Sequence, residues 1–114
     1  MPLSDRALLG RILSRSNQLQ DAFNEDFNND VPLVELIGQF NYYIRDLKGM
    51  SNRIHKNEVR RELTRLLENG TWNVNLMGER VLADRRLPED KYSDIVNQLF
   101  DEVTSYVRNP GHPV

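Results

Sequence analysis

The sequence predicts a mainly α-helical protein, a small antiparallel bundle of about four helices. Apolar residues recur along most of the chain at the 3.6-residue spacing of amphipathic helices. Residues that begin or end helices stand between these apolar stripes. A chain of 114 residues is long enough to bury one hydrophobic core. We therefore expect one helical domain over residues 1–109, followed by a flexible C-terminal tail over residues 110–114.

The first helix is expected from about Asp5 to about Phe27. Ser4 is placed to cap its N-terminus, and Asp5 falls in the first turn, where the helix dipole favours an anion. The run 28–30, Asn-Asn-Asp, prefers caps and turns to helix interiors and ends the helix. The apolar stripe consists of Leu8, Ile12, Leu19, Ala22, Phe23 and Phe27.

The second helix, Leu33 to about Ile54, has the most regular pattern in the chain. Asp30 can cap its start, and Pro32 can occupy its first turn, where a missing N–H costs little. The stripe consists of Leu33, Leu36, Ile37, Phe40, Tyr43, Ile44, Leu47, Met50 and Ile54.

A break is expected near 55–57, because an unbroken helix would turn its apolar face by about half a revolution. A third helix then runs from Glu58 to Glu68, capped by Asn57 and ended by Asn69 and Gly70.

Residues 71–83 allow two structures. Apolar and polar residues alternate over 72–76, which favours a short β-hairpin at 72–83 that turns at 77–79. The alternative is a helix capped by Thr71, with Val74, Met77 and Val81 on one side. Two interior asparagines disfavour the helix, so we expect the hairpin.

The last helix is expected to begin within 87–90, Leu-Pro-Glu-Asp, because proline and acidic residues are typical of a first turn. It continues to about Arg108. Its stripe consists of Tyr92, Ile95, Val96, Leu99, Val103, Tyr106 and Val107.

The composition narrows the class of function. The absence of cysteine excludes disulfides and thiolate metal sites and suits a reducing compartment. No signal-peptide pattern and no run of about 20 apolar residues is present, so we expect a cytoplasmic protein that does not cross a membrane.

The sequence shows no catalytic centre. The spacings of zinc sites, EF-hands and phosphate-binding loops are absent. Ser51 and His55 stand four residues apart, but the expected helix break beside them makes a catalytic pair doubtful. We expect no enzyme, no cofactor and no metal.

Charge is concentrated in the middle of the chain, although the formal net charge is only −2. Residues 45–65 carry seven basic and three acidic groups, a net of +4. Residues 1–44 carry three basic and six acidic groups, and residues 66–114 carry five basic and eight acidic groups, so each flank has a net of −3. A basic centre thus stands between two acidic flanks.

The basic centre is the candidate binding surface. Tyr42, an aromatic residue off the apolar stripe, shares the outward side of the second helix with Arg45 and with two glycines whose presence in a helix is costly. The candidate partner-binding residues are Tyr42, Arg45, Lys48, Gly49, Arg53, Lys56, Arg60 and Arg61.

These residues predict a non-enzymatic protein–protein interaction module of the small adaptor, inhibitor, immunity-protein or assembly-chaperone type. Its partner would be an acidic protein surface or a second copy of the chain. The alternative is a nucleic-acid-binding protein that uses the Arg45–Arg65 stretch, with the second and third helices arranged like a helix-turn-helix. The net charge of −2 weighs against this alternative.

Overall fold

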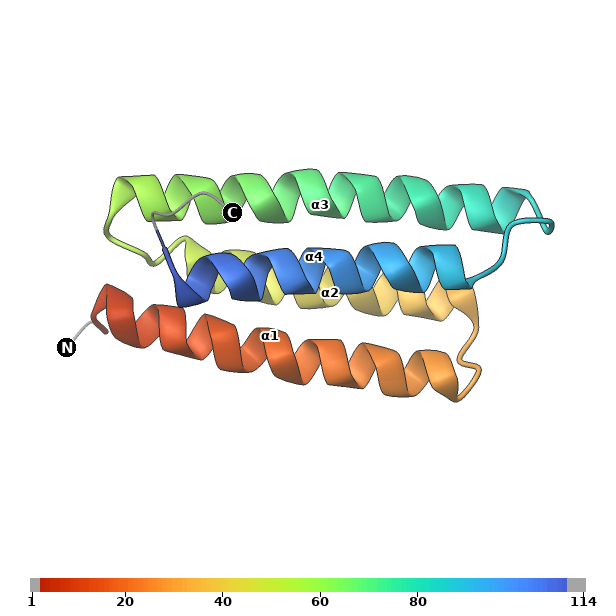
Figure 1. The fold of residues 1–114 in the computed structure, drawn as a ribbon, viewed down its shortest axis with the longest axis horizontal. Coiled ribbons are helices and arrows are strands. Elements are labelled where there is room, and N and C mark those ends of the chain that lie inside the picture. The colour runs from red at the N-terminus through yellow and green to blue at the C-terminus, as the bar shows by residue number, and fades with distance from the viewer. Residues whose placement is uncertain (1–2, 111–114) are drawn as a thin grey trace.

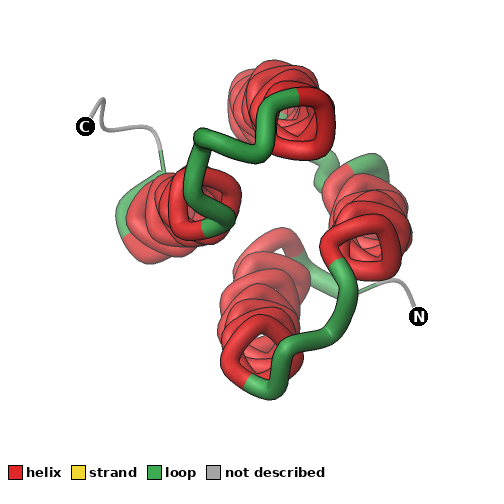
Figure 2. Tube along the Cα trace, turned by 90° about the vertical axis from the view of Figure 1, so that its right-hand side faces the viewer, coloured by secondary structure: helices red, strands yellow, loops and turns green. Residues whose placement is uncertain are grey.

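The computed structural model describes residues 3–110, which form four α-helices: α1 (Asp5–Asn28), α2 (Leu33–Ser51), α3 (Asn57–Ala83) and α4 (Asp90–Arg108). Each helix runs antiparallel to the one before it (Figure 1). Each also packs against two neighbours, in the cyclic order α1–α2–α3–α4, so the four helices surround one core (Figure 2). The predicted antiparallel helical bundle is confirmed.

The core is built from the apolar stripes of all four helices. Phe40 of α2 and Phe100 of α4 belong to diagonally opposite helices, and their rings meet edge to face with 6.3 Å between centroids. Phe23 and Tyr92 make a similar contact at 5.9 Å between α1 and α4. Aromatic pairs in this geometry contribute beyond the apolar area they bury, so they hold the bundle together across its centre.

The caps and breaks are only partly as expected. Asp30 does not cap α2: the N-cap is Pro32, which precedes the first turn, and no side chain caps the helix. The Ser4 hydroxyl accepts a hydrogen bond from the Ala7 N–H at 3.1 Å, which confirms Ser4 as the N-cap of α1. The break between α2 and α3 is also confirmed, and α2 ends at Ser51 rather than near Ile54. Asn57 is the first residue of α3 and does not cap it.

The prediction for residues 69–83 is wrong. α3 continues through Asn69 and Gly70 to Ala83, and the β-hairpin at 72–83 does not form. Gly70 is required by packing instead: a Cβ there would overlap the side chain of Leu99 on α4. The glycine therefore allows α3 and α4 to approach closely and does not end the helix.

The first turn of α1 and the last turn of α4 lie at the same end of the bundle as the α2–α3 loop (Figure 1). The expected flexible tail, 110–114, lies outside the described residues except for Pro110. The described helices include none that is long and apolar enough to cross a membrane.

Candidate interaction surface

The predicted partner-binding residues lie on α2, on α3 and in the loop between them. Tyr42, Arg45, Lys48 and Gly49 belong to α2. Arg53 and Lys56 are exposed in the loop, and Arg60 and Arg61 lie in the first two turns of α3. Because α2 and α3 are packed neighbours, Arg45, Lys48, Gly49, Arg60 and Arg61 line the seam between them, whereas the exposed residues Tyr42, Arg53 and Lys56 do not. We call the outer surface of α2, α3 and the loop between them the α2–α3 face.

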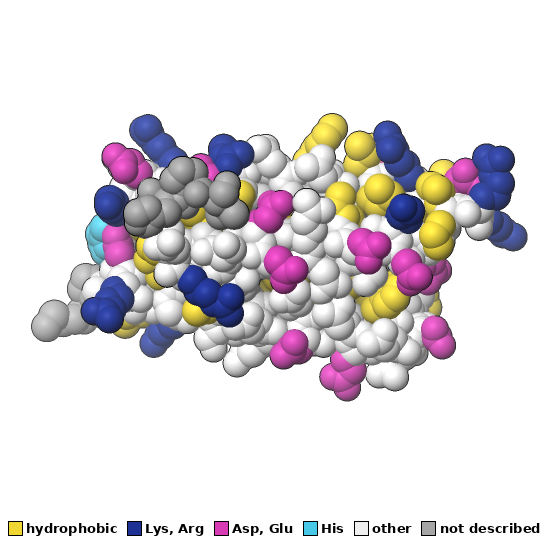
Figure 3. All heavy atoms as spheres, viewed as in Figure 1, with side chains coloured by type: hydrophobic (Ala, Val, Ile, Leu, Met, Phe, Trp, Pro, Cys, Tyr) yellow, Lys and Arg dark blue, Asp and Glu magenta, His cyan; other side chains and the backbone are white. Residues whose placement is uncertain are grey.

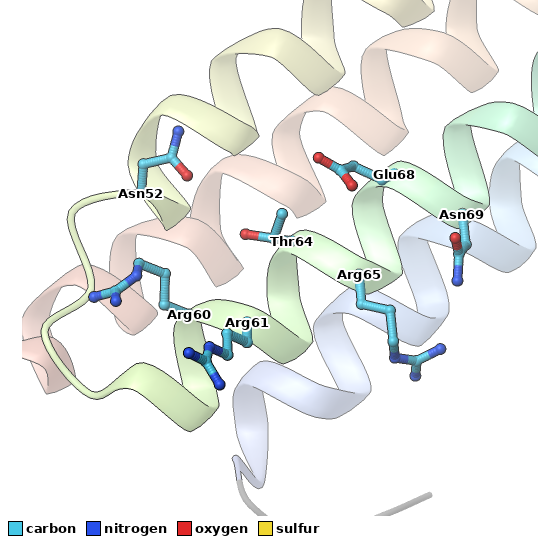
Figure 4. A pocket seen from close by; sticks show the side chains of 7 residues that line it. All are labelled: Asn52, Arg60, Arg61, Thr64, Arg65, Glu68 and Asn69. Carbon is cyan, nitrogen blue, oxygen red and sulfur yellow. The ribbon is translucent and has the colours of Figure 1, made fainter.

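Two open hollows follow the seam between α2 and α3. One, of about 480 Å³, is lined by Arg45, Lys48 and Gly49, together with Thr71 of α3. The other, of about 300 Å³, is lined by Arg60, Arg61 and Arg65. Asn52 lines both hollows, so they are adjacent. Figure 4 shows the second hollow: Thr64 and Glu68 point toward α2, whereas Arg65 extends away from it.

Some of the predicted cations are held by partners within the chain. The Arg60 guanidinium donates to the carbonyl oxygen of Ile54 at 2.8 Å and also bonds the Asn57 side chain, so it fixes the α2–α3 loop. Lys48 Nζ lies 3.5 Å from a carboxylate oxygen of Glu68 across the seam. These two residues support the local structure, and their charge is partly satisfied.

The other predicted cations remain available. Within residues 3–110, Arg45, Arg53, Lys56 and Arg61 form no ion pair and no side-chain hydrogen bond, and all four are exposed. By contrast, Arg65 is paired with Glu62, which holds the pKa of the Glu62 carboxyl below its usual value. The positive charge of the α2–α3 face therefore comes mainly from these four side chains.

Large exposed apolar side chains are also found on α2 and α3. Tyr42 is 68% exposed and Val34 66% exposed on α2, while Trp72 is 67% exposed and Leu82 49% exposed on α3. Trp72 belongs to the segment that was predicted as a β-hairpin, and it is instead an exposed residue of α3. The available signal was helical phase: if α3 continues through Gly70, Trp72 falls on the side opposite Leu67 and Val74.

The two outward glycines of α2 have no neighbour in the chain. A Cβ at Gly38 or Gly49 would meet no atom within 4 Å, apart from the backbone of its own helix. Glycine in a helix interior costs about 1 kcal/mol relative to alanine. No contact among the described residues offsets this cost, so packing within the bundle does not explain these glycines.

The residues considered for catalysis do not form a site. The buried Ser51 hydroxyl donates to the carbonyl oxygen of Leu47 at 2.9 Å, while His55 is exposed and its Nδ1 lies 3.1 Å from Asp5. Ser51 and His55 therefore have different partners. Within residues 3–110, no group of three or more histidine or acidic side chains is placed to hold a metal ion.

The helix-turn-helix arrangement is also not formed. α2 and α3 run side by side and antiparallel, whereas the two helices of that motif cross at a steep angle so that one can enter a DNA groove (Figure 1).

No protein-family model, no curated protein and no solved structure matches this chain.

Proposed function

We propose that this protein is a non-enzymatic protein–protein interaction module that docks an acidic protein surface on its α2–α3 face. The observation that carries the proposal is the set of exposed cations Arg45, Arg53, Lys56 and Arg61, which have no ion pair among residues 3–110, together with the exposed ring of Tyr42 one turn before Arg45. Surface cations without an internal partner mainly speed encounter with an anionic partner and select against others. Tyrosine and arginine are the side chains most often found at interface hot spots.

The hollows along the α2–α3 seam support docking of side chains rather than a flat contact. Each hollow is lined by basic side chains and a threonine, Thr71 in one and Thr64 in the other, and Glu68 also lines the second hollow. A carboxylate that enters either hollow can accept charge-assisted hydrogen bonds, which are stronger than neutral ones. An acidic segment of a partner is the chemistry that fits.

A role as an adaptor, inhibitor, immunity protein or assembly chaperone is consistent with such a module. A location in the cytoplasm is part of the same proposal, because a cysteine-free chain suits a reducing compartment.

The proposal is tested by capture on the immobilised protein from the lysate of its own source, with nuclease present and mass spectrometry as the readout. We expect an acidic protein to be captured by the native chain and lost with Arg45→Glu or Arg61→Glu. Arg6→Glu is the matched control, because Arg6 is exposed on α1 and forms no ion pair among the described residues.

Two results would contradict the proposal. Equal capture by all four proteins would show that the α2–α3 face is not the docking surface. Bound nucleic acid that disappears with nuclease or salt would instead support phosphate binding by the Arg45–Arg65 stretch.

A further inference from the structure

The outward side of α2 is an uncovered helix face with both charge signs. Its residues lie opposite the buried stripe of α2, and no other helix lies over them (Figure 2). We call them the outer stripe: Glu35, Gly38, Tyr42, Arg45, Gly49 and Arg53. All six are exposed, and Arg53 lies just beyond the end of the helix.

The outer stripe is complementary to itself when two copies lie antiparallel. A two-fold axis that passes between positions 43 and 44 places Tyr42 of one copy opposite Arg45 of the second copy. The same axis places Glu35 beside Arg53 of the second copy, near each end of the stripe. An arginine over a tyrosine ring is attracted by the ring's negative face, and the carboxylate attracts the guanidinium. Each of these contacts occurs twice in a symmetric pair.

The two glycines fit the same register. Gly38 and Gly49 are eleven residues apart, about three turns or 16 Å along the helix, so they lie on the same side. With the axis between positions 43 and 44, Gly38 of one copy faces Gly49 of the second copy. A glycine on each side lets two helix backbones approach closely, and a Cβ at either position would meet only open space in the single chain.

The distribution of charge over the whole bundle also favours an antiparallel orientation of the two copies, independently of the contacts in the outer stripe. The half that contains the α2–α3 loop (residues 3–16, 42–69 and 99–110) carries eleven basic and seven acidic side chains, a net of +4. The other half (17–41 and 70–98) carries four basic and ten acidic side chains, a net of −6. Figure 3 shows, on its visible face, basic side chains at both ends and acidic ones spread between them, so the two halves differ in net charge without separating the two signs.

Two copies that lie side by side and antiparallel therefore place each basic half against an acidic half, whereas parallel copies would place like charges together. The molecule is 48 Å long and 23 Å across. The long side of a molecule with these dimensions is large enough to contain an interface of standard size, roughly 800 Å² on each partner.

We propose that the partner of the α2–α3 face is a second copy of this chain, bound antiparallel through the outer stripe of α2. The inference rests on the proposed function and names its partner: the acidic half of each copy supplies the acidic surface that the basic half of the other binds.

The test is a charge exchange between Glu35 and Arg53, followed by sedimentation velocity at low ionic strength. The native protein is expected to sediment as a dimer, with twice the 13.3 kDa mass of one chain. Glu35→Arg alone places two arginines at each end of the stripe, and Arg53→Glu alone places two glutamates there, so each should weaken dimerisation at least tenfold. An equimolar mixture of these two variants should dimerise again, as should the variant that carries both substitutions.

Asp94→Arg and Arg6→Glu are the matched controls, because both residues are exposed, unpaired within residues 3–110 and outside the outer stripe. Each control changes the charge of its half by two, as each single test variant does, so the controls measure the effect of the halves' charge alone. The outer stripe is supported only when Glu35→Arg and Arg53→Glu weaken dimerisation at least tenfold more than the controls do. Circular dichroism on every variant separates loss of dimer from loss of fold.

Two outcomes would overturn the inference: a native chain that stays monomeric up to about 1 mM, or single reversals that weaken dimerisation without recovery on mixing. The lysate capture separates this failure from failure of the proposed function. If the chain is monomeric but Arg45→Glu still abolishes capture, the proposed function is retained and the second copy is rejected as the partner. If the chain is monomeric and Arg45→Glu does not change capture, both proposals are rejected.

Discussion

At the scale of single residues, Asp5 links the first turn of α1 to the loop that precedes α3. Its carboxylate accepts hydrogen bonds from the backbone N–H groups of His55 at 2.8 Å and Lys56 at 2.9 Å. These donors precede α3, so a residue in the first turn of α1 satisfies polar groups about 50 positions away. The His55 N–H, the Lys56 N–H and the His55 ring together hold the pKa of the Asp5 carboxyl below its usual value.

This shift predicts a loss of stability in acid. Because the pKa of Asp5 is lower in the folded chain than in the unfolded chain, its contribution is complete above the unfolded value of about 3.9 and is lost as the pH falls through the folded value. Asp5→Asn should lower the thermal midpoint at pH 7 and should reduce the drop in midpoint between pH 5 and pH 2. Thermal unfolding at a series of pH values measures both. An unchanged slope would mean that other carboxylates cause the acid loss.

The glycines predict opposite effects for the same substitution. At a concentration where the chain is monomeric, Gly38→Ala and Gly49→Ala should each stabilise the fold by about 1 kcal/mol, because in the single chain the new methyl group meets open space and alanine favours the helix. Gly70→Ala should instead destabilise by about 1 kcal/mol, because displacing Leu99 in the core costs more than the helix propensity returns. Urea unfolding of the three variants gives the signs. Stabilisation by Gly70→Ala would show that Leu99 moves aside at little cost.

At the scale of elements, two of the four neighbouring helix pairs, α2–α3 and α1–α4, are each linked by a reciprocal pair of asparagine amides. Asn41 of α2 and Asn75 of α3 exchange hydrogen bonds of 3.0 and 2.9 Å. Asn24 of α1 and Asn97 of α4 do the same at 2.9 Å in each direction. An amide that both donates and accepts fits only one longitudinal position of its partner, so these pairs set the register between neighbouring helices.

A double-mutant cycle tests this for α2 and α3. Asn41→Ala and Asn75→Ala should show a coupling energy of about 1 kcal/mol, since either single substitution leaves the remaining amide without its partner. The matched control is Asn73→Ala, which removes an exposed asparagine two positions away and should show no coupling with Asn41→Ala. Coupling near zero for Asn41 and Asn75 would mean that water replaces the pair without cost.

At the scale of the whole molecule, buried and exposed aromatic residues have different roles. Phe40 and Phe100 are fully buried where α2 and α4 meet across the core, whereas Trp72 and Tyr42 point into solvent on the α2–α3 face. Exposed aromatic side chains contribute little to folding and are available for association.

The single tryptophan allows a direct measurement of this difference. Trp72→Ala should change the free energy of unfolding by less than about 0.5 kcal/mol, because the indole is largely in solvent, whereas Phe100→Ala should cost about 3–5 kcal/mol. In the native chain, acrylamide should quench the Trp72 fluorescence efficiently. Weak quenching of Trp72 in the free monomer would contradict the exposed position of this side chain on α3.

The positions of the helices and of the candidate surface could be predicted from sequence because they depend on local chemistry. The apolar stripes of α1, α2 and α4, the Ser4 cap and the break before α3 all follow from side chains within a few residues of one another. The phase of α2 likewise placed Tyr42 and Arg45 on the outside, because a regular helix determines which side chains share a face.

What only the tertiary structure decided involves contacts between distant residues. Gly70 and Asn75 oppose a helix by their local preferences, yet Gly70 lets α3 meet Leu99 and Asn75 gains a partner in Asn41. Packing and hydrogen bonds across the bundle outweigh a propensity penalty of about 1 kcal/mol per residue. The same holds for charge. The sequence alone determined that residues 45–65 are basic. Only the folded chain decided that Arg60 and Lys48 have internal partners while Arg45 and Arg61 remain available. Ion pairing depends on distances between side chains, and the packed helices set those distances.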